Sequence, residues 1–495
     1  MDTDVIVVGA GPTGLALAGS LLAAGVAVRV LDKASGPATT SRALGLQPRG
    51  VEVLDRLGAL GDLPGRALPV NRLTVVVGDR ELASVRLAQS TTLDGPRALL
   101  MSQADIEGAL RERLAALGGT VEWGRGVSGV IVGSDSAGVR LDDGTELDAH
   151  WVVGADGAHS AVRKMLDIGF PGVPLVERFL LADIRADVNR PRDGATSWLG
   201  RDTMLAAFPL PGADLWRLMA PAPPGFADDA SARDIADYLT GQFPAGAIGA
   251  THAVEWTSTF RIQRRLADTY RRGRVLLAGD AAHIHSPLGG QGMNTGIGDA
   301  ENLAWKLALV ISGRADAHLI DSYQAERRPV AEDVLETTSG ITQLLMGDGA
   351  LRRWLRDQVA VPLLNREWMH RLVTDKASQL QISYRHGPLG AHTRLPRPGP
   401  QPGDRLPDRR LTDTRGRSVR LFEVLGAHWA LVGPAHLAAV AAERLGELVV
   451  PLEGADADAM LVRPDAHLAW RGSDPQRLRD WLGTHLGAAT GILTR

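Results

Sequence analysis

One glycine-rich turn near the start of the chain limits its possible folds more than any other feature. An apolar run over residues 5–8 is typical of a buried parallel strand, and it breaks at Gly9, Gly11 and Gly14. Helix-forming residues follow, and a second apolar run ends on Asp32. In this spacing Gly9 permits a tight turn, Gly11 lets the backbone approach a pyrophosphate, and Gly14 lets the helix pack closely. The pattern predicts a dinucleotide-binding βαβ unit with Asp32 on a ribose, and it leaves FAD and NAD both open.

Length and composition set further limits. A chain of 495 residues is too long for one compact core, and its length suggests about three domains. The 54 basic and 57 acidic residues give a net charge of -3, which provides no general attraction to nucleic acid or membrane. The absence of cysteine excludes disulfides, thiolate metal sites and thiol redox chemistry. The strand-like start is unlike a signal peptide, and no apolar stretch approaches the ~20 residues of a membrane span, so we expect a soluble cytoplasmic protein.

The order of strand-like and helix-like segments predicts an α/β fold: a Rossmann-like domain with an inserted sheet domain and a small C-terminal α/β unit. For the nucleotide-binding domain we expect residues 1–72, 98–170 and 266–340. For the inserted sheet domain we expect residues 73–97 and 171–265. After these come a helical connection over 341–386, a Pro- and Gly-rich linker over 387–411 and the C-terminal domain over 412–495.

Local signals predict several individual elements. Ser102 can cap a helix over residues 102–118, whose apolar residues recur along one face. The dipeptide Asp143-Gly144 is a strong turn signal within a hairpin over 127–147. Further helices are expected near residues 231–243, 295–311 and 437–448.

Two later segments carry an acid where a predicted strand ends. Asp156 follows one strand in GADGAHSAVRKML, and Asp280 follows another in LLAGDAAHIHSPLGGQGMN. An acid at a strand end is suited to binding a polyol such as the ribitol of a flavin. A helix start at Gly292 would present unpaired backbone amides of Gly292, Met293 and Asn294 to the negative charge of a reduced flavin ring. Alone, Asp156 is equally explained as a turn former and Asp280 as a helix cap, but their occurrence together with the first turn favours a cofactor site.

Taken together, the three segments resemble the group A flavoprotein monooxygenases, which have the para-hydroxybenzoate hydroxylase fold, and within them the bacterial polyketide hydroxylases and rifampicin monooxygenases. GAGPTG is similar to the family's FAD fingerprint, GADGAHSAVR to its DG motif, and AGDAAHIHSPLGGQGMN to its GD motif with the flavin loop. The tail RPDAHLAWR resembles a hairpin of the thioredoxin-like C-terminal domain of these hydroxylases, and the lack of cysteine agrees with the loss of thiol chemistry there. The resemblance covers essentially the whole chain.

The resemblance implies that the nucleotide-binding domain holds FAD, and it implies which residues line the site. Besides the three glycines, these are Thr13, Asp32, Lys33, Arg42, Gln103, Val127, Asp156, Asp280, Pro287, Gly292, Met293 and Asn294. Asp32 stands where relatives often carry Glu. Without the family, Arg42 and Gln103 are equally well explained as solvated surface residues. No catalytic residue and no metal ligand is predicted.

The resemblance also implies an ordered reaction. NAD(P)H reduces FAD, the reduced flavin takes up O2, and a flavin C4a-hydroperoxide hydroxylates a bulky phenolic substrate, for which we expect a polycyclic polyketide or polyketide antibiotic. Since no second nucleotide motif is visible, NADPH or NADH is expected to dock transiently, with Asp156 and Arg163 as candidate contacts; Arg163 is otherwise an exposed helix residue. The expected partners are the aromatic substrate and O2, without nucleic acid or membrane, in a monomer or homodimer.

Other outcomes stay open at this stage. The same flavin site can perform Baeyer-Villiger insertion or inactivate an antibiotic by hydroxylation. A non-catalytic FAD-binding scaffold is argued against by the retention of both Asp156 and Asp280. A plain NAD dehydrogenase is the weakest interpretation, because it would not need the second glycine loop. The sequence determines neither the substrate, the regiochemistry, a general base nor the choice between NADPH and NADH.

Five conspicuous aromatic and histidine residues are predicted to be structural. His283 and His285 lie beside the glycine loop, but no acid cluster at metal-ligand spacing accompanies them. Trp198, Trp216 and Trp256 alternate with strand residues, and core packing is the commoner role of such side chains.

Overall fold

The glycine-rich start folds as a strand, a helix and a strand at the centre of a parallel sheet. In the computed structural model, β1 (Thr3–Val8), α1 (Pro12–Ala23) and β2 (Val28–Asp32) follow one another as predicted. The strands of this sheet, in spatial order, are β17 (Arg271–Arg272), β18 (Val275–Leu277), β11 (Glu146–Gly154), β1, β2 and β8 (Val121–Trp123). Because β1, β11 and β18 run parallel, their carboxyl ends bring the three sequence motifs to one edge of the sheet.

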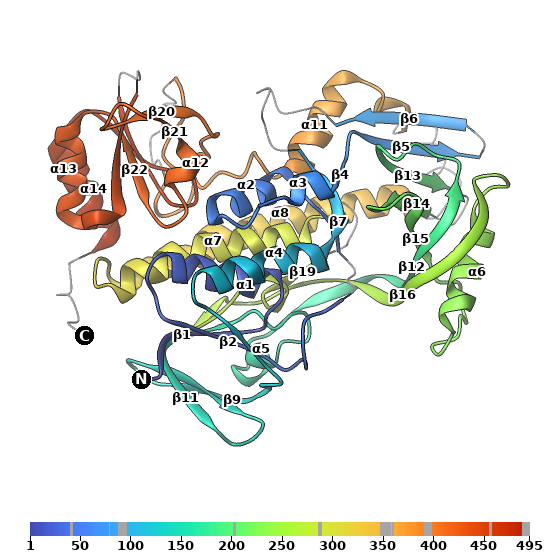
Figure 1. Cartoon of the computed structure of the whole chain (residues 1–495), viewed down its shortest axis with the longest axis horizontal. Helices are drawn as coiled ribbons and strands as arrows, with labels where there is room; N and C mark the ends of the chain where they lie inside the picture. The colour runs from blue at the N-terminus through green and yellow to red at the C-terminus, as the bar shows by residue number, and fades with distance from the viewer. Residues whose placement is uncertain are drawn as a thin grey trace.

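The structure describes most of the chain: residues 1–39, 43–78, 80–87, 97–200, 204–285, 290–346, 358, 361–390, 398–454 and 458–487. Figure 1 shows three bodies along the long axis: the parallel sheet with its helices near the centre, a second sheet at one end, and a smaller domain at the other. Within these ranges no helix is long and apolar enough to cross a membrane.

Two predicted elements flank the parallel sheet. The helix α4 (Gln103–Ala116) begins after Ser102, whose hydroxyl accepts a hydrogen bond from the backbone of Ala104 at 3.2 Å, so the predicted cap is confirmed. The hairpin of β9 (Val127–Val132), β10 (Ala137–Leu141) and β11 turns at Asp143 and Gly144, and Gly144 has a φ of +85°. These additions complete the nucleotide-binding layer.

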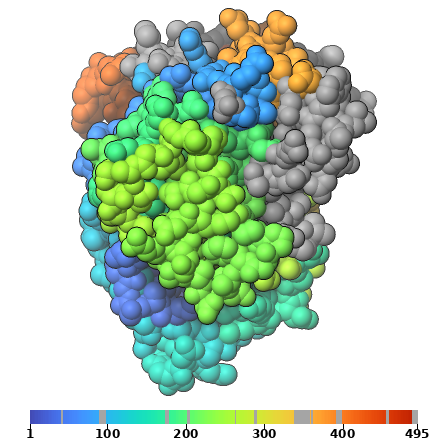
Figure 2. Space-filling model, turned by 90° about the vertical axis from the view of Figure 1, so that its right-hand side faces the viewer, coloured from blue at the N-terminus to red at the C-terminus, as the bar shows by residue number. Residues whose placement is uncertain are grey.

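The inserted domain is a second, largely antiparallel sheet. Its strands, in spatial order, are β19 (His283–Ile284), β16 (Ile248–Leu266), β12 (Gly172–Val188), β15 (Leu215–Pro221), β14 (Met204–Pro209), β13 (Gly194–Leu199), β5 (Arg72–Val77) and β6 (Arg80–Arg86). The helix α6 (Ala232–Gln242) covers one face. Trp198 and Trp216 are buried between sheet and helix, so their predicted structural role is confirmed. In Figure 2 this domain, in green, fills the middle of the face in view.

Short elements join the two sheets near their common edge. They are β3 (Leu44–Leu46), β4 (Leu68–Pro69) and β7 (Leu99–Ser102), which form a small sheet, and the helices α2 (Pro48–Leu57), α3 (Leu63–Arg66) and α5 (Ala161–Met165). The 3-10 turn η1 (Gly279–Ala281) follows β18 directly. The edge between the sheets is therefore built from loops and helix starts.

Helices connect this centre to the remaining domain. The helix α7 (Gly292–Ile311) begins three residues before the predicted start at 295. At 20 residues it is about 30 Å long, and it runs from the edge of the sheets to the C-terminal domain (Figure 1). The elements that follow are η2 (Ala317–Ile320), α8 (Asp321–Met346), α10 (Val361–Leu363) and α11 (Glu367–Ser378).

The C-terminal domain is a mixed α/β unit. Its strands, in spatial order, are β21 (Ser418–Arg420), β20 (Arg410–Asp413), β23 (Val449–Glu453), β22 (Trp429–Val432), β24 (Ala459–Val462) and β25 (Leu468–Gly472). Its helices are α12 (Leu421–Val424), α13 (Ala435–Leu445), η4 (Gly446–Leu448) and α14 (Pro475–Leu486). Trp305 and Leu309 of α7 belong to its apolar core, so the domain packs directly on α7. Residues 398–411, expected as linker, pack against it, and Leu406 is buried there.

Candidate functional site

The three glycines of the first turn have different surroundings. Gly9 has a φ of +108°, and a Cβ placed on it would lie 2.4 Å from the carbonyl oxygen of Ala155. A Cβ on Gly14 would lie 1.9 Å from the carbonyl oxygen of Gly9. A Cβ on Gly11 would meet no atom within 4 Å, and Gly11 lines a large cavity. The protein's own packing therefore requires glycine at two of these positions, and at Gly11 the chain leaves open space.

Asp32 fixes the ends of the first two strands. Its Oδ2 accepts a hydrogen bond from the backbone N–H of Ala10 at 2.7 Å, and its Oδ1 accepts one from Ala34 at 2.8 Å. The carboxylate does not line the cavity, and the neighbouring Lys33 is exposed. In this structure Asp32 shapes the turn after β2, and its expected contact with a ribose stays a prediction.

Asp156 caps the helix that follows it. Its Oδ2 accepts hydrogen bonds from the backbone N–H groups of Ala161 and Val162, at 2.7 and 3.1 Å, at the start of α5. Its Oδ1 is buried and has no hydrogen-bond partner among the described residues. One oxygen thus serves the fold, and the other is left for a donor that the described chain does not supply.

Arg163 is not the exposed helix residue that the sequence suggested as an alternative to reductant docking. It is 5% exposed, and its guanidinium donates to the carbonyl oxygens of Ala281 at 2.9 Å and Ala158 at 3.0 Å. The guanidinium also lies over the ring of Phe170, 3.8 Å from the ring centroid. The exposed alternative is wrong because Arg163 turns inward and ties the DG segment to the GD segment.

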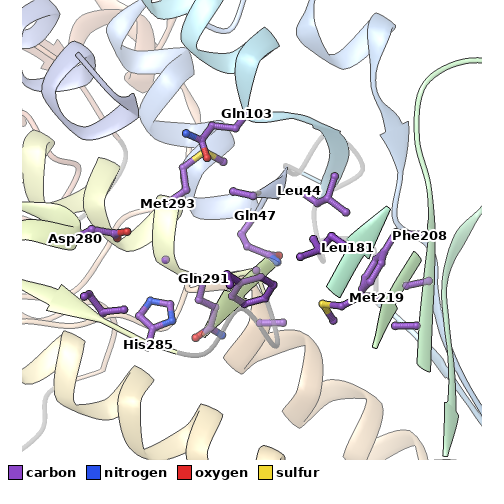
Figure 3. A pocket seen from close by; sticks show the side chains of 18 of the residues that line it. Leu44, Gln47, Gln103, Leu181, Phe208, Met219, Asp280, His285, Gln291 and Met293 are labelled. Atoms are coloured by element: carbon purple, nitrogen blue, oxygen red, sulfur yellow. The ribbon is translucent and has the colours of Figure 1, made fainter. Parts of the chain in front are cut away.

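Asp280 is the acid of the site that faces open space. It lies in η1, and its carboxylate points into the cavity in Figure 3. Its side chain is exposed toward the cavity, and many protein atoms nevertheless lie around it. Burial there raises the pKa of Asp280, and the negative charge of Asp299 adds to the effect, while His283 opposes it. A partner that donates hydrogen bonds would relieve this cost.

A buried acid on α7, which sequence reasoning missed, holds the segment around Asp280. Asp299 accepts hydrogen bonds from the backbone N–H of Gly279 at 3.1 Å and from His283 Nε2 at 2.6 Å, assigning that nitrogen the proton. Arg327 donates to its other oxygen at 2.7 Å. Although burial alone raises the pKa of Asp299, His283 and Arg327 hold it below its usual range. The structural role predicted for His283 is confirmed. The sequence signal that could have identified Asp299 is an acid within the glycine-rich start of a long helix.

Thr13 brings the first glycine-rich turn into contact with the GD segment and with α7. A Cβ on Gly279 would lie 2.5 Å from the hydroxyl oxygen of Thr13, and a Cβ on Gly296 would lie 2.3 Å from it. Thr13 on α1 therefore fits between the GD segment and α7 only because both facing residues are glycine. The predicted meeting of these segments is seen in the structure.

The start of α7 has no side-chain cap. Gln291 is its N-cap residue, and its side chain makes no capping hydrogen bond. Among the described residues no side chain is seen to bond the backbone amides of Gly292 and Met293, and both residues line the cavity. Asn294 is buried: its Oδ1 accepts from the backbone N–H of Gln47 at 2.9 Å, and its Nδ2 donates to the carbonyl oxygen of Gly290 at 2.9 Å.

One cavity of about 1950 Å³ spans the edge between the two sheets. Figure 3 shows Asp280, Gln103 and Met293 at one end, and Leu181, Phe208 and Met219 of the second sheet at the other. Its volume is about twice the upper limit for a single small-molecule pocket, ~1,000 Å³. The cavity therefore has room for a large cofactor together with a separate ligand.

The predicted site residues fall into three groups. Those that line the cavity are Gly11, Thr13, Gln103, Asp280, Gly292 and Met293. Those that the structure places outside its lining are Gly9, Gly14, Asp32, Lys33, Val127, Asp156 and Asn294. Arg42 and Pro287 lie outside the described residues.

Several lining residues were not among the predicted site residues. Leu44 and Gln47 come from β3 and the start of α2, and Gln291 and His285 flank the glycine loop. His285 was predicted to be structural, yet its ring faces the cavity beside Gly292 (Figure 3). Only the folding of α2 against α7 places these side chains together.

These features define a class of protein. Open space at Gly11, an acid pointing into the cavity at Asp280 and an uncapped helix start at Gly292 fit a dinucleotide whose phosphates, polyol and ring occupy successive parts of one cavity. The site is that of a flavin-type oxidoreductase.

Comparison with known proteins identifies the family. The model of the FAD binding domain matches residues 2–338, and that of the aromatic-ring hydroxylase C-terminal domain matches residues 399–489. The chain belongs to the FAD-dependent aromatic hydroxylases, among the homologues of the rifampicin monooxygenases and polyketide hydroxylases, and is an FAD-dependent monooxygenase.

Individual relatives cover nearly the whole chain. The chain is 36% identical to a rifampicin monooxygenase of Streptomyces venezuelae, over 98% of this chain and 99% of the relative. It is 38% identical to a 6-methylpretetramide 4-monooxygenase of Streptomyces rimosus, over 81% and 73%. Among solved structures it is similar to CabE, an aromatic hydroxylase from angucycline biosynthesis, with a TM-score of 0.79, 31% identity and coverage of 99% and 100%. A complex of aklavinone-11 hydroxylase with FAD and aklavinone matches with a TM-score of 0.78, 25% identity and coverage of 98% and 99%.

Proposed function

We propose that this monooxygenase uses NAD(P)H and O2 to hydroxylate a bulky phenolic substrate, a polycyclic aromatic polyketide or polyketide antibiotic. The observation that carries the proposal is the two-ended cavity of about 1950 Å³, which has room for FAD together with a large ligand. When bound, FAD supplies electron transfer from the nicotinamide and activation of O2. The relatives named for rifampicin and 6-methylpretetramide support a large substrate.

The cofactor end of the cavity is assigned to residues that the motifs contribute. Gly11 and Thr13 would lie along the pyrophosphate, Asp280 would accept hydrogen bonds from the ribitol hydroxyls, and the amides of Gly292 and Met293 would face the ring. The positive end of the α7 dipole lies at those amides, so it would stabilise negative charge on a reduced ring. Asp32, Lys33, Gln103, Val127, Asp156, Asn294, Arg42 and Pro287 are proposed as the remaining cofactor residues.

The other end of the cavity is suited to a flat aromatic substrate. Leu181, Phe208 and Met219 give it an apolar wall, which excludes water and contacts fused rings. Arg217 also lines the cavity, with its guanidinium bonded to both oxygens of Asp183 at 2.6 and 2.7 Å. This fixed cation would hold a substrate phenol oxygen, including its deprotonated form, in one orientation.

The reductant is proposed to dock transiently. One FAD-binding domain accounts for residues 2–338, and the sequence carries no second nucleotide motif. Asp156 and Arg163 stay candidates for contact with NADPH or NADH. Because Arg163 already donates to two carbonyl oxygens, we expect it to act from its present position.

The test is substrate-stimulated turnover. Purified protein with bound FAD is mixed with NADPH or NADH and a panel of polycyclic phenols, and nicotinamide oxidation, O2 uptake and peroxide are recorded together. We expect a polycyclic phenol to stimulate oxidation strongly with little peroxide, and a single-ring phenol to release most of the oxygen as peroxide. Equal responses to both would exclude a substrate site matched to fused rings.

A second candidate outcome is inactivation of an antibiotic, which the two rifampicin monooxygenase relatives at 36% and 34% identity favour. The product decides the outcome: hydroxylation and Baeyer-Villiger insertion both add one oxygen atom, so NMR is needed to separate them, and a growth assay shows whether the product is still active. Asp280→Ala distinguishes an enzyme from a scaffold, because an enzyme that loses its flavin loses its activity, whereas a scaffold should tolerate the loss.

We also propose several properties of the whole chain. Residues 1–72, 98–170 and 266–340 would form the FAD-binding domain, with 73–97 and 171–265 as substrate domain, 341–386 as helical connection and 387–411 as linker. Residues 412–495 would be a thioredoxin-like domain, which without cysteine has no thiol chemistry. We expect a cytoplasmic monomer or homodimer without nucleic acid or membrane partners; mass photometry would measure the oligomeric state.

A further inference from the structure

The C-terminal domain inserts one turn deep into the FAD-binding domain. This turn, residues 463–467, joins β24 to β25 and includes the RPDAH sequence. Arg463, Asp465 and His467 are at most 1% exposed. Ala466 has a φ of +60°, a conformation that costs a non-glycine residue energy and persists only where surroundings hold it. Such burial of charge calls for partners of opposite sign.

Asp465 and Arg463 bind α7 and α8. Asp465 Oδ2 accepts hydrogen bonds from Trp305 Nε1 at 3.2 Å and Asn302 Nδ2 at 3.3 Å. Arg463 donates to both carboxylate oxygens of Glu326, at 2.7 and 3.0 Å. Although burial raises it, the positive charge of Arg463 keeps the pKa of Asp465 well below its usual range, so the charges are present at neutral pH.

The same turn also binds α2. The carbonyl oxygen of Asp465 accepts a hydrogen bond from Arg49 at 2.9 Å, and Arg49 also pairs with Glu301 of α7 at 3.2 Å. Arg405, just before the C-terminal sheet, donates to both oxygens of Glu52 at 2.8 and 3.0 Å. One residue of the C-terminal domain therefore contacts both helices whose starts lie at the cavity.

The starts of α2 and α7 both form part of the cavity wall. Gln47 and Gln291 are the N-cap residues of α2 and α7, both line the cavity, and neither has a side-chain cap. The two helix starts are also bonded to each other, because Asn294 accepts a hydrogen bond from the backbone N–H of Gln47. Arg49 lies only two residues beyond Gln47, and Asn302 lies ten residues, about 15 Å, beyond Gly292.

Directional bonds at this interface restrict sliding of one helix past another. Apolar contacts alone, such as the packing of Trp305 on Trp429 with ring centroids 5.2 Å apart, tolerate small shifts. A buried network in which each charge has fixed partners favours one arrangement. The network thus sets where the two helix starts lie relative to each other.

We propose that Asp465 is a positioning residue for the flavin site: its carboxylate fixes α7 through Asn302 and Trp305, and its main-chain carbonyl oxygen holds Arg49 of α2. The inference rests on the proposed placement of the flavin ring against the starts of these helices. The C-terminal domain is then a part of the oxygenase site that acts through α2 and α7 and touches neither cofactor nor substrate.

The test compares Asp465→Asn with Asp413→Asn in the full chain. Asp413 is a matched control, because it is a buried acid of the same domain whose hydrogen bonds go to Arg415 and Arg417, within that domain. Trp305→Phe is a second variant that keeps an aromatic ring and removes the Nε1–H donor to Asp465, together with the five-membered ring of the indole. If Asp465→Asn fails to fold, Trp305→Phe alone tests the proposal.

The first readout needs no flavin. In hydrogen exchange on apoprotein, we expect the peptide spanning 290–297 to exchange at least tenfold faster in Asp465→Asn and faster also in Trp305→Phe, with no change in Asp413→Asn. The first two variants keep the bond from Arg49 to the main-chain carbonyl oxygen of Asp465, so the peptide spanning 43–51 should change less, through the bond between Gln47 and Asn294. In holoprotein we expect weaker FAD binding and a larger share of NADPH oxidation ending as peroxide. Wild-type exchange in the peptide spanning 290–297, or an even increase over the whole chain, would overturn the inference. Failure of every phenol to stimulate turnover would instead refute the proposed function and leave the exchange result intact.

Discussion

Gly11→Ala separates what the fold needs from what the cofactor needs. The backbone at Gly11 has φ -75° and ψ -179°, which alanine adopts without strain, and the added Cβ would meet no atom within 4 Å. Replacing glycine with alanine in such a conformation stabilises a protein by about 0.4–1 kcal/mol through the unfolded state. Alanine is a poorer N-cap than glycine, which offsets a similar amount at the start of α1. The net change in the free energy of unfolding of the apoprotein is therefore within about 1 kcal/mol of zero.

The same methyl group should impair FAD binding. It occupies the space where the turn is expected to approach the pyrophosphate, so the cofactor has to shift or the turn has to move. We expect the Kd for FAD to rise at least tenfold, which corresponds to about 1.4 kcal/mol. Titration of apoprotein with FAD, followed by flavin fluorescence, measures this change.

Gly14→Ala is the contrasting control. Its Cβ would lie 1.9 Å from the carbonyl oxygen of Gly9, a backbone atom that cannot move without opening the turn. Overpacking of this kind costs about 1–3 kcal/mol or more, so the apoprotein itself should unfold at lower urea. The reasoning is refuted if Gly11→Ala apoprotein is as destabilised as Gly14→Ala, or if it binds FAD with wild-type affinity.

Three further substitutions give distinct outcomes. The pKa of Asp280 is raised in the folded apoprotein, so its negative charge costs stability above that pKa. Asp280→Asn apoprotein should therefore be more stable than wild type to urea at pH 7, and the difference should vanish toward pH 4. FAD binding should be weakened at every pH. Surrounding cations lower the pKa of buried Glu326 to about 2, so Glu326→Gln should lower the free energy of unfolding by roughly 3 kcal/mol at pH 7. A loss of stability that does not shrink as the pH falls below 4.5 would contradict this. Met219→Trp should raise the KM for a polycyclic phenol more than for a single-ring phenol and leave FAD affinity unchanged.

Much of the fold follows from local sequence signals. The first strand, helix and strand, the capped helix after Ser102 and the hairpin at Gly144 are where the sequence predicts them, because each depends on hydrogen bonds and backbone conformations within a few residues. The start of α7 differs by three residues, since the glycines that open it weaken the helical signal.

The site was predictable only in part. Asp280 and Met293 were identified through motifs and do line the cavity, whereas Asn294 is buried behind it with its side chain bonded to Gln47. Gln47 itself belongs to no motif, and its place in the wall depends on how α2 packs against α7. Arg163 turns inward for a similar reason, because acceptors for its guanidinium come from another segment.

The sequence by itself predicted a dinucleotide site, because glycine and acid spacings encode short-range geometry around a dinucleotide, and its resemblance to the aromatic hydroxylases implied FAD and the family. Tertiary structure alone decided which motif residues reach the cavity, how large that cavity is, and that the C-terminal domain reaches α2 and α7 through Asp465. These features join residues hundreds of positions apart. Their contacts depend on the simultaneous packing of three domains, which no local pattern of residues records.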